Sequence, residues 1–500
     1  MKKQSKEARQ NDEKGKRTDE KIKKSLRYSI LDGSFYSAMV GFGESFFSAF
    51  AIFLGATSVQ LGLLGSLPQA LGAISQLFTN KLLALFGNSR KRFVCVNAFL
   101  TALMYIPIAL VYFFGAFKVY HLIMFTCIYW LLGTIISPAW NSWMGDLVQE
   151  DKRGTYFGRR NKIAGLTSFF ALMIGGFILQ NFGKGTQSEY YGFLVIFTLA
   201  LISRIISFVY LTKKYEPKYI VKKEAEFGFL EFLRKARFSN YGHFVFYLSF
   251  MNFAVYLSGP FFTAYMLYDL KMDYMTFTVV TATALIVKYL MMPVWGKAVD
   301  RYGTKRVLAL TGFILPLSPV LWLFSHETWY LLLIQCYSGF VWAGFEISSF
   351  NFIFDTTTPE KRATCVAYYN VLNGIAIFTG AMVGGFIIKY NLSHGVIDSK
   401  ILWSSYMIVF LISGILRLCA SIFFIPKLKE VREVKKTTYK KLFLTIITSM
   451  PTMGLVHNAI IITKMTKEKE KNLVENLKEF TKKHKEELII GEKKFVRKIK

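Results

Sequence analysis

The sequence predicts an all-α polytopic membrane protein, with twelve transmembrane helices in two pseudo-symmetric six-helix bundles. Three observations predict this fold class: the apolar composition, the uneven placement of basic residues and an internal repeat. Of the 500 residues, 53% are hydrophobic and 19% are charged, whereas soluble globular chains carry about 25% charged residues. Between Tyr28 and Ile425 the chain is a series of apolar runs, each comparable to the ~20 residues that a helix needs to cross a bilayer core. Because lipid offers the backbone no hydrogen-bond partners, such runs must be helical.

We expect six spans in each half of the chain. In the first half they lie at 29–57, 59–86, 93–115, 120–148, 161–182 and 190–212. In the second half they lie at 239–268, 274–299, 306–325, 328–355, 363–390 and 401–425. The predicted domains are a basic N-terminal tail at 1–27, a first bundle at 28–212, a linker at 213–238, a second bundle at 239–425 and a basic C-terminal tail at 426–500. The first span is too long for a cleavable signal peptide, so we expect it to be retained.

One further run, at 442–463, is apolar enough to suggest a thirteenth span. It contains Pro451, Gly454 and His457, and a span there would carry the lysine-rich end of the chain to the opposite face of the membrane. We therefore expect an interfacial or bundle-docked segment, with a spanning helix as the alternative.

The formal net charge is +30, and most of the basic residues lie in the two tails and the central linker. The segments on the other side of the predicted spans carry few lysines or arginines. This bias predicts a multi-pass protein of the cell membrane with both termini in the cytoplasm. We also expect the tails to contact anionic lipid headgroups, and we do not expect nucleic acid binding.

The sequence lacks the motifs of disulfide frameworks, metal sites and phosphate-binding loops. The five cysteines and six histidines are scattered, without the spacing of a disulfide framework or a metal site. The segment Gly183–Thr186 does not have the spacing of a phosphate-binding loop. We expect no cofactor, no metal and no enzymatic activity, and we expect a monomer.

The internal repeat joins residues 142–182 to residues 351–391 without a gap, with twelve identities in 41 positions. Shared hydrophobicity explains matched phenylalanines, but it does not explain Asp146 matched to Asp355 or two adjacent glycines in both copies. Six spans separate the copies, so both cross the membrane in the same direction. The halves are therefore predicted to be parallel repeats about an axis along the membrane normal.

The loop between spans eight and nine carries a glycine, an acidic–basic pair, a second glycine and a basic pair, at Gly296, Asp300, Arg301, Gly303, Lys305 and Arg306. This pattern resembles the loop signature of the major facilitator superfamily. Gly303 permits a tight turn, and the Asp300 carboxylate suits a helix N-terminus or a guanidinium group. The alternative is an ordinary basic cytoplasmic loop. The matching loop of the first half departs from the pattern, because Ala84 stands where the counterpart of Asp300 would be.

The loops after spans four and ten also resemble those of the superfamily. They carry Asp146 and Arg153 in the first half and Asp355 and Arg362 in the second. The resemblance implies a cytoplasmic gate of charges that breaks and re-forms as the halves rock, with Asp300 meeting the N-terminus of span eleven near Arg362. Static ion pairing that only orients the helices is the alternative.

Ionisable residues inside the predicted spans are the candidates for ion coupling. Glu44, Lys288 and Glu346 fall near mid-span, where a charge costs about 2.5–3.5 kcal/mol on insertion scales. The resemblance implies that spans one and ten line a central cavity, where a carboxylate can be shared between proton and substrate. The alternative is a Glu–Lys pair that only locks two helices. Arg204 and Arg417 lie nearer the cytoplasmic end of spans six and twelve, and we expect them to reach the headgroups, with a functional role as the alternative.

Two further groups of residues concern the cavity and the packing. Candidate cavity residues, which offer stacking and hydrogen bonds to a solute, are Trp140, Asn141, Asn252, Trp342 and Asn351. Small residues four apart, at Ala171 and Gly175 and at Gly380 and Gly384, indicate close helix packing. In the superfamily their spans, five and eleven, lie between the halves.

The resulting hypothesis is a secondary active transporter that moves a small organic solute by alternating access, coupled to protons or another ion as a symporter or antiporter. The alternative is a transporter-like receptor or scaffold that signals through the basic C-terminal tail. A polytopic enzyme acting on a lipid lacks any catalytic constellation here. Fold alone does not select a substrate.

Overall fold

The computed structural model describes residues 2–149, 153–186, 188–217, 228–394 and 404–432, together with positions 434, 439, 442 and 446. Residues 1–435 form one compact unit, and residues 436–500 form a second. Apart from two isolated positions, the predicted interfacial segment 442–463 lies outside the described residues.

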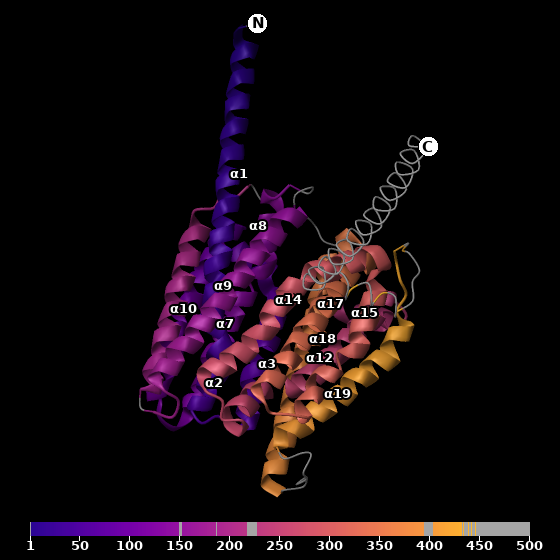
Figure 1. Cartoon of the computed structure of the whole chain (residues 1–500). Helices are drawn as coiled ribbons and strands as arrows, with labels where there is room; N and C mark the ends of the chain where they lie inside the picture. Colours follow the sequence, from indigo (N-terminus) through magenta and orange to yellow (C-terminus); the bar gives the residue numbers. More distant parts are fainter. Residues whose placement is uncertain are drawn as a thin grey trace, which may run out of the picture. The chain divides into compact units, whose positions relative to one another are not determined.

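The described residues hold twelve helices long and apolar enough to cross a membrane, as predicted. The first six spans are built from α1 (Lys2–Phe42) with α2 (Phe47–Phe53), α3 (Ser58–Ser75) with α4 (Thr79–Leu85), α5 (Arg90–Leu103) with α6 (Tyr105–Leu110), α7 (Lys118–Thr134) with α8 (Ser137–Leu147), α9 (Arg153–Phe182) and α10 (Glu189–Thr212). A short helix, α11 (Phe229–Ala236), leads to the second six: α12 (Asn240–Ser258) with α13 (Phe261–Ala264), α14 (Tyr274–Tyr302), α15 (Thr304–Ile314) with α16 (Leu317–Val320), α17 (Thr328–Thr356), α18 (Pro359–His394) and α19 (Ser405–Phe424). Figure 1 shows the first half in indigo and magenta and the second half mainly in orange.

Successive spans cross in opposite directions, so their turns gather at two ends. We call the end at which α1 enters the first span the tail end; it holds the turns at 86–89, 213–217 and 302–304 and the segment 425–432. The far end holds the turns at 54–57, 183–186, 270–273 and 324–327. Helix α1 already begins at Lys2, so the predicted N-terminal tail continues directly into the first span.

The first span is broken where a candidate coupling residue lies. A short 3₁₀ turn, Glu44–Phe46, separates α1 from α2. Gly43 precedes it, and a Cβ atom on Gly43 would collide with the Tyr105 hydroxyl group. The glycine therefore lets a tyrosine of the third span approach the backbone beside Glu44.

The repeated glycines explain how α9 and α18 pack within their own halves. A Cβ atom on Gly175 would lie 2.6 Å from the Phe46 ring of the first span. A Cβ atom on Gly384 would collide with the Leu257 carbonyl group of α12. These glycines lie against spans one and seven, which occupy corresponding places in the two halves.

The next glycine along each helix faces the opposite half. Gly176 of α9 packs against Thr278 of α14. A Cβ atom on Gly385 of α18 would lie 3.2 Å from the Ser58 carbonyl oxygen of α3. Spans five and eleven therefore do lie between the halves, as the resemblance implies (Figure 1).

Polar contacts between the halves gather at the far end. The Lys184 ammonium group donates to the carbonyl oxygens of Leu267 at 2.6 Å and Met272 at 3.0 Å. The Tyr274 hydroxyl group donates to Glu189, also across the halves. Nearer the middle, Tyr256 donates to Gln69 at 2.7 Å and Asn370 to Gln76 at 3.0 Å. Among the described residues, the polar networks of the tail end instead join groups of the same half.

Candidate functional site

A central cavity lies between the two halves and has a volume of about 660 Å³. Its polar and aromatic lining comes from both halves and consists of Ser45, Gln69, Asn252, Tyr256, Thr281, Lys288, Ser338, Trp342 and Glu346. Cavities of about 300–1,000 Å³ are typical of small-molecule sites. Two of the predicted cavity residues, Asn252 and Trp342, therefore line one site with two of the predicted coupling residues.

Lys288 of α14 and Glu346 of α17 form an ion pair across this cavity wall. Their charged groups are 3.0 Å apart, and the side chains are 23% and 41% exposed. Trp342 lies one turn before Glu346 on the same helix face and also contacts the cavity. The pair is the one that the locking hypothesis anticipates, and the coupling role of Glu346 stays a prediction.

Glu44 lies in a different environment from Glu346. Its carboxylate accepts a hydrogen bond of 2.6 Å from the Tyr129 hydroxyl group. The Tyr105 hydroxyl group in turn donates to Tyr129 at 3.3 Å. The ion pairs of the described residues do not include Glu44. The two predicted coupling carboxylates thus differ, because one is bound by hydroxyl groups and the other by an ammonium group.

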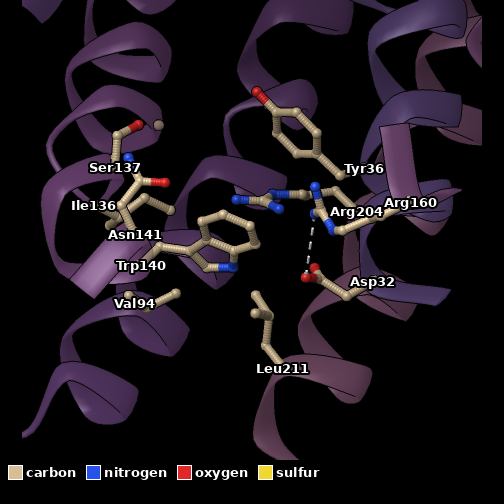
Figure 2. A pocket seen from close by; sticks show the side chains of 11 residues that line it. Asp32, Tyr36, Val94, Ile136, Ser137, Trp140, Asn141, Arg160, Arg204 and Leu211 are labelled. Carbon is tan, nitrogen blue, oxygen red and sulfur yellow. Dashed lines mark ion pairs between the residues drawn. The ribbon is translucent and has the colours of Figure 1, made fainter. Parts of the chain in front are cut away.

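A second cavity, the first-half cavity, has a volume of about 250 Å³ (Figure 2). Its polar and aromatic lining consists of Asp32, Tyr36, Ser137, Trp140, Asn141, Arg160 and Arg204. The predicted cavity residues Trp140 and Asn141 lie here rather than in the central cavity. The linings of the two cavities do not include Asn351, which is half-buried on α17.

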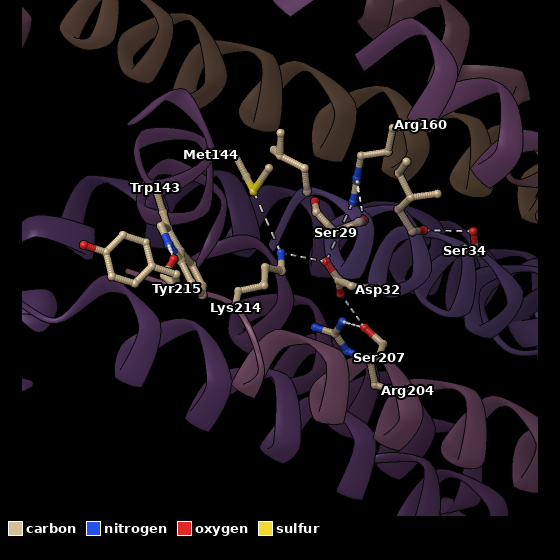
Figure 3. A network of polar contacts seen from close by, with 12 residues as sticks. Ser29, Asp32, Ser34, Trp143, Met144, Arg160, Arg204, Ser207, Lys214 and Tyr215 are labelled. Atoms are coloured by element: carbon tan, nitrogen blue, oxygen red, sulfur yellow. Dashed lines mark hydrogen bonds and ion pairs between the residues drawn. The ribbon is translucent and has the colours of Figure 1, made fainter. Parts of the chain in front are cut away.

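A buried charge network adjoins the first-half cavity (Figure 3). Asp32 is 3% exposed and accepts from Lys214 at 3.1 Å and from Ser207 at 2.8 Å. The Arg160 guanidinium group lies 4.0 Å from the same carboxylate. Asp32 and Lys214 were not among the residues predicted from the sequence, because one lies near the predicted start of a span and the other in the predicted linker. A carboxylate inside an apolar run was the available signal.

Lys214 shows that the first residues after α10 belong to the bundle. Its side chain is fully buried, with the ammonium group 5.2 Å from the Trp143 ring and 5.5 Å from the Trp140 ring. The indole nitrogen of Trp143 donates to the Tyr215 carbonyl oxygen at 2.9 Å. Burial lowers the pKa of Lys214, and the neighbouring Asp32 carboxylate opposes this shift.

The prediction that Arg204 and Arg417 reach lipid headgroups is wrong. The two residues are 2% and 3% exposed. Arg204 donates to Ser207 at 3.2 Å, and Arg417 donates to Ser258 at 3.2 Å. Both α10 and α19 turn these side chains toward the interior of their own half. A helical period cannot distinguish that face from a lipid-facing one when both faces are apolar.

At the tail end of the first half, Arg90, Asp146 and Glu216 form a network of ion pairs and hydrogen bonds around the start of α5, which we call the first brace. The Arg90 guanidinium group, which is fully buried, lies 2.7 Å from Asp146 and 3.9 Å from Glu216. Glu216 also accepts hydrogen bonds from the Lys91 backbone at 3.1 Å and the Ser89 hydroxyl group at 2.8 Å. A carboxylate at this position stabilises the positive end of the helix dipole.

The second half repeats this brace with different residues. Asp355 accepts from the Thr304 hydroxyl group at 2.6 Å, and the Arg432 guanidinium group lies 2.7 Å from it. The backbone nitrogen of Lys305 donates to Glu430 at 2.9 Å. The segments that follow spans six and twelve therefore each supply a carboxylate to the start of α5 or α15.

The predicted gate residues of the signature loop lie around the second brace. Asp300 is 78% exposed, and its nearest described ion-pair partner is Arg432 at 3.8 Å. Gly303 has a φ of +95°, and a Cβ atom there would collide with the Glu430 carboxylate. The Arg301 guanidinium group lies 5.3 Å from the Tyr302 ring.

The structure describes the surroundings of the remaining predicted gate residues only in part. Lys305 and Arg306 fall in the first turn of α15. The side chains of Arg153 and Arg362 lie outside the described residues, so the predicted contact between Asp300 and Arg362 stays a prediction, as does gating itself.

Because Asp355 belongs to the second brace and Asp300 is exposed, we expect their replacement to affect the stability of the protein unequally. Replacement Asp355→Asn weakens charged hydrogen bonds to a nearly buried carboxylate and should destabilise the protein by about 1.5–3 kcal/mol. The matched change Asp300→Asn, at an exposed site, should alter stability by less than about 0.5 kcal/mol. Thermal unfolding of the purified variants in detergent measures both, and equal effects would contradict the brace.

Comparison with known proteins gives a family match over most of the chain. The family model described as Major Facilitator Superfamily matches residues 33–262 and 242–480. Over 96 residues the chain is 31% identical to the efflux pump azaK of Aspergillus niger, a match covering 19% of this chain and 20% of the pump. Over 110 residues it is 29% identical to the class B tetracycline resistance protein of Escherichia coli, covering 22% and 27%. These matches span about a fifth to a quarter of the two curated relatives.

Solved structures share the fold over most of their length. The D-xylose–proton symporter is 13% identical with a TM-score of 0.63, covering 83% of this chain and 99% of that chain. The nucleoside transporter NupG is 16% identical with a TM-score of 0.58, covering 82% and 100%. A bacterial homologue of the iron transporter ferroportin, in an inward-facing state, is 13% identical with a TM-score of 0.56, covering 81% and 98%. At these identities the likeness concerns the fold alone.

Proposed function

Because the chain belongs to the Major Facilitator Superfamily, we propose that it is a secondary active transporter that moves a small organic solute across the cell membrane by alternating access. The observation that carries this proposal is the central cavity, which both halves line with polar and aromatic groups. A solute bound there contacts each half, so relative motion of the halves changes the side from which it is reached.

The distribution of contacts supports a cavity that opens toward the tail end. At the far end, Lys184 and Tyr274 tie the halves together, whereas the braces of the tail end remain within each half. With the basic tails in the cytoplasm, this arrangement corresponds to an inward-facing state. The glycines that let α9 and α18 approach the opposite half provide a close-packed surface for rocking.

We assign ion coupling to Glu44 and Glu346, with protons as the coupling ion. Glu44 is bound by a hydroxyl group rather than a cation, so taking up a proton breaks no ion pair. Glu346 is neutralised by Lys288, so a solute that displaces Lys288 also changes the environment of the carboxylate. Glu346 lines the central cavity, and Ser45, the residue after Glu44, lines it as well.

The variants Glu44→Gln and Glu346→Gln test this assignment. Each should abolish uphill solute accumulation in proteoliposomes with an imposed pH gradient, while downhill exchange persists, because glutamine cannot carry the proton. Proton movement is followed with a pH-sensitive dye inside the vesicles during a screen of solute classes. Glu327→Gln, at an exposed far-end position, is the matched control. Unchanged proton coupling in both cavity variants would refute the assignment.

The receptor or scaffold hypothesis gains no support from the comparisons. It depends on the C-terminal tail, most of which lies outside the described residues. A truncation that removes the tail should begin after residue 435, because Glu430 and Arg432 contact the second half. Solute flux that persists in this truncation would leave the scaffold hypothesis without its main argument.

A further inference from the structure

Arg204 presents unpaired donors to the first-half cavity. The residue is 2% exposed, and its Nη1 atom donates to Ser207 at 3.2 Å. Within the part of the chain that the structure describes, its Nε and Nη2 atoms have no hydrogen-bond partner. Buried polar groups in proteins are hydrogen-bonded with few exceptions, and an unpaired charged donor is especially costly. Because Arg204 lines the cavity, a ligand there can supply the missing acceptors.

The charged groups around the first-half cavity carry an excess of positive charge, which also favours an anionic ligand. Arg160, Arg204 and Lys214 surround one carboxylate, Asp32, which is already bound by Lys214 and Ser207. Two positive charges are therefore left in excess within this network. Glu44 is attracted electrostatically by Arg204 and offsets part of the excess when it is ionised. Buried charge without compensation is strongly unfavourable, so the network favours an added anion.

The two unpaired donors of Arg204 have a geometry that suits a carboxylate group. The Nε–H and Nη2–H bonds of a guanidinium group lie along the same edge and point in parallel, which matches the two oxygen atoms of a carboxylate. Lysine has no such planar pair of donors. The orientation of this edge is held because Nη1 is bound to Ser207 and the guanidinium carbon lies 4.9 Å from the Tyr36 ring.

Aromatic and amide groups complete the cavity. The Arg160 guanidinium carbon lies 4.6 Å from the Trp140 ring, and Figure 2 shows the two guanidinium groups between Tyr36 and Trp140. Asn141 lines the same space and offers a donor and an acceptor to the body of a ligand. The volume of about 250 Å³ limits that body to a small molecule.

We propose that the first-half cavity is a binding site for a small organic carboxylate, with the Nε and Nη2 atoms of Arg204 holding the carboxylate group and Arg160 adding a second positive charge. The ligand body lies beside Asn141 and Ser137, which line the same cavity. The inference goes beyond the proposed function, because the first half alone lines this cavity, whereas both halves line the central cavity assigned to the transported solute.

The test measures ligand binding by thermal unfolding of the purified full-length protein in detergent. The probes are acetate, lactate, succinate and benzoate, each paired with its uncharged amide, together with methyl phosphate. At least one carboxylate should raise the unfolding temperature while its amide does not. The variant Arg204→Lys should weaken that binding by roughly ten- to a hundredfold, since the paired charged hydrogen bonds are lost.

Arg417→Lys is the matched control. Arg417 occupies the corresponding place in span twelve and is equally buried, but it lies outside the lining of both cavities. Its replacement should leave carboxylate binding unchanged. If Arg204→Lys does not fold, Asn141→Ala takes its place, and it should weaken carboxylate binding without lowering the unfolding temperature of the free protein, because the Asn141 side chain is exposed to the cavity.

Several results would overturn the proposal. They are an absence of stabilisation by every carboxylate, equal stabilisation by an amide, stabilisation by methyl phosphate alone, or equal losses in the Arg204 and Arg417 variants. Binding is measured without flux, so the outcome is separate from that of the proton-coupling experiment. Carboxylate binding without any transport would retain the site and remove the proposed function, whereas proton-coupled flux of neutral solutes without carboxylate binding would do the reverse.

Discussion

The replacement Asp32→Asn is expected to destabilise the first half by about 3–5 kcal/mol, the cost of leaving buried charges without their partner. The Asp32 carboxylate lies 3.1 Å from the Lys214 ammonium group and 4.0 Å from the Arg160 guanidinium group. Lys214 is fully buried, with its ammonium group 5.2 Å from the Trp143 ring and 5.5 Å from the Trp140 ring, so water does not compensate its charge when the carboxylate is lost. Thermal or denaturant unfolding in detergent measures the loss.

A second variant separates the charge effect from a loss of shape. In the double variant Asp32→Asn with Lys214→Met, the most deeply buried cation is removed together with its carboxylate, and much of the lost stability should return. The free-energy changes of two replacements are expected to be non-additive when the two residues are in direct contact. If Asp32→Asn alone were as stable as the unmodified protein, the excess positive charge inferred for this network would be wrong.

The replacement Gly384→Val should have an effect of similar size through packing alone. Any Cβ atom at this position would collide with the Leu257 carbonyl group and lie 2.7 Å from the Phe261 ring. Because a backbone group of α12 cannot move aside without separating the two helices, we expect a cost of about 3 kcal/mol or more. The yield of folded protein and its unfolding temperature report this change.

Its neighbour and a distant glycine provide the controls. Gly385→Ala introduces a Cβ atom 3.2 Å from the Ser58 carbonyl oxygen of the opposite half. This variant should fold, because each half remains intact, but should transport more slowly, because the contact between the halves is altered. Gly158→Ala on α9 meets no atom within 4 Å and should be neutral or stabilising by about 1 kcal/mol. Comparable losses of folded protein at all three positions would contradict the packing roles.

The spans were predictable because each depends on a local property of the chain. The run at 190–212 became α10 at Glu189–Thr212, and the run at 328–355 became α17 at Thr328–Thr356. A helix must be apolar for its whole length to lie in a bilayer, so the sequence carries that information at every position. The repeat similarly predicted two related halves, and the small residues four apart in spans five and eleven predicted close packing.

The partners of individual side chains depended on how the helices are placed and rotated. Asp32 meets Lys214 across 182 residues of sequence, and no local pattern connects them. The sequence indicated three charges inside the spans, but not that Lys288 pairs with Glu346 while Glu44 is bound by Tyr129.

The sequence by itself determined the fold class, the number of spans and the set of polar residues available to a site. The tertiary structure alone decided that Trp140 and Asn252 line different cavities and that Arg204 turns inward rather than toward lipid. The physical reason is that hydrophobicity records removal from water, which lipid and protein interior provide equally. Only the packing of neighbouring helices distinguishes those two environments.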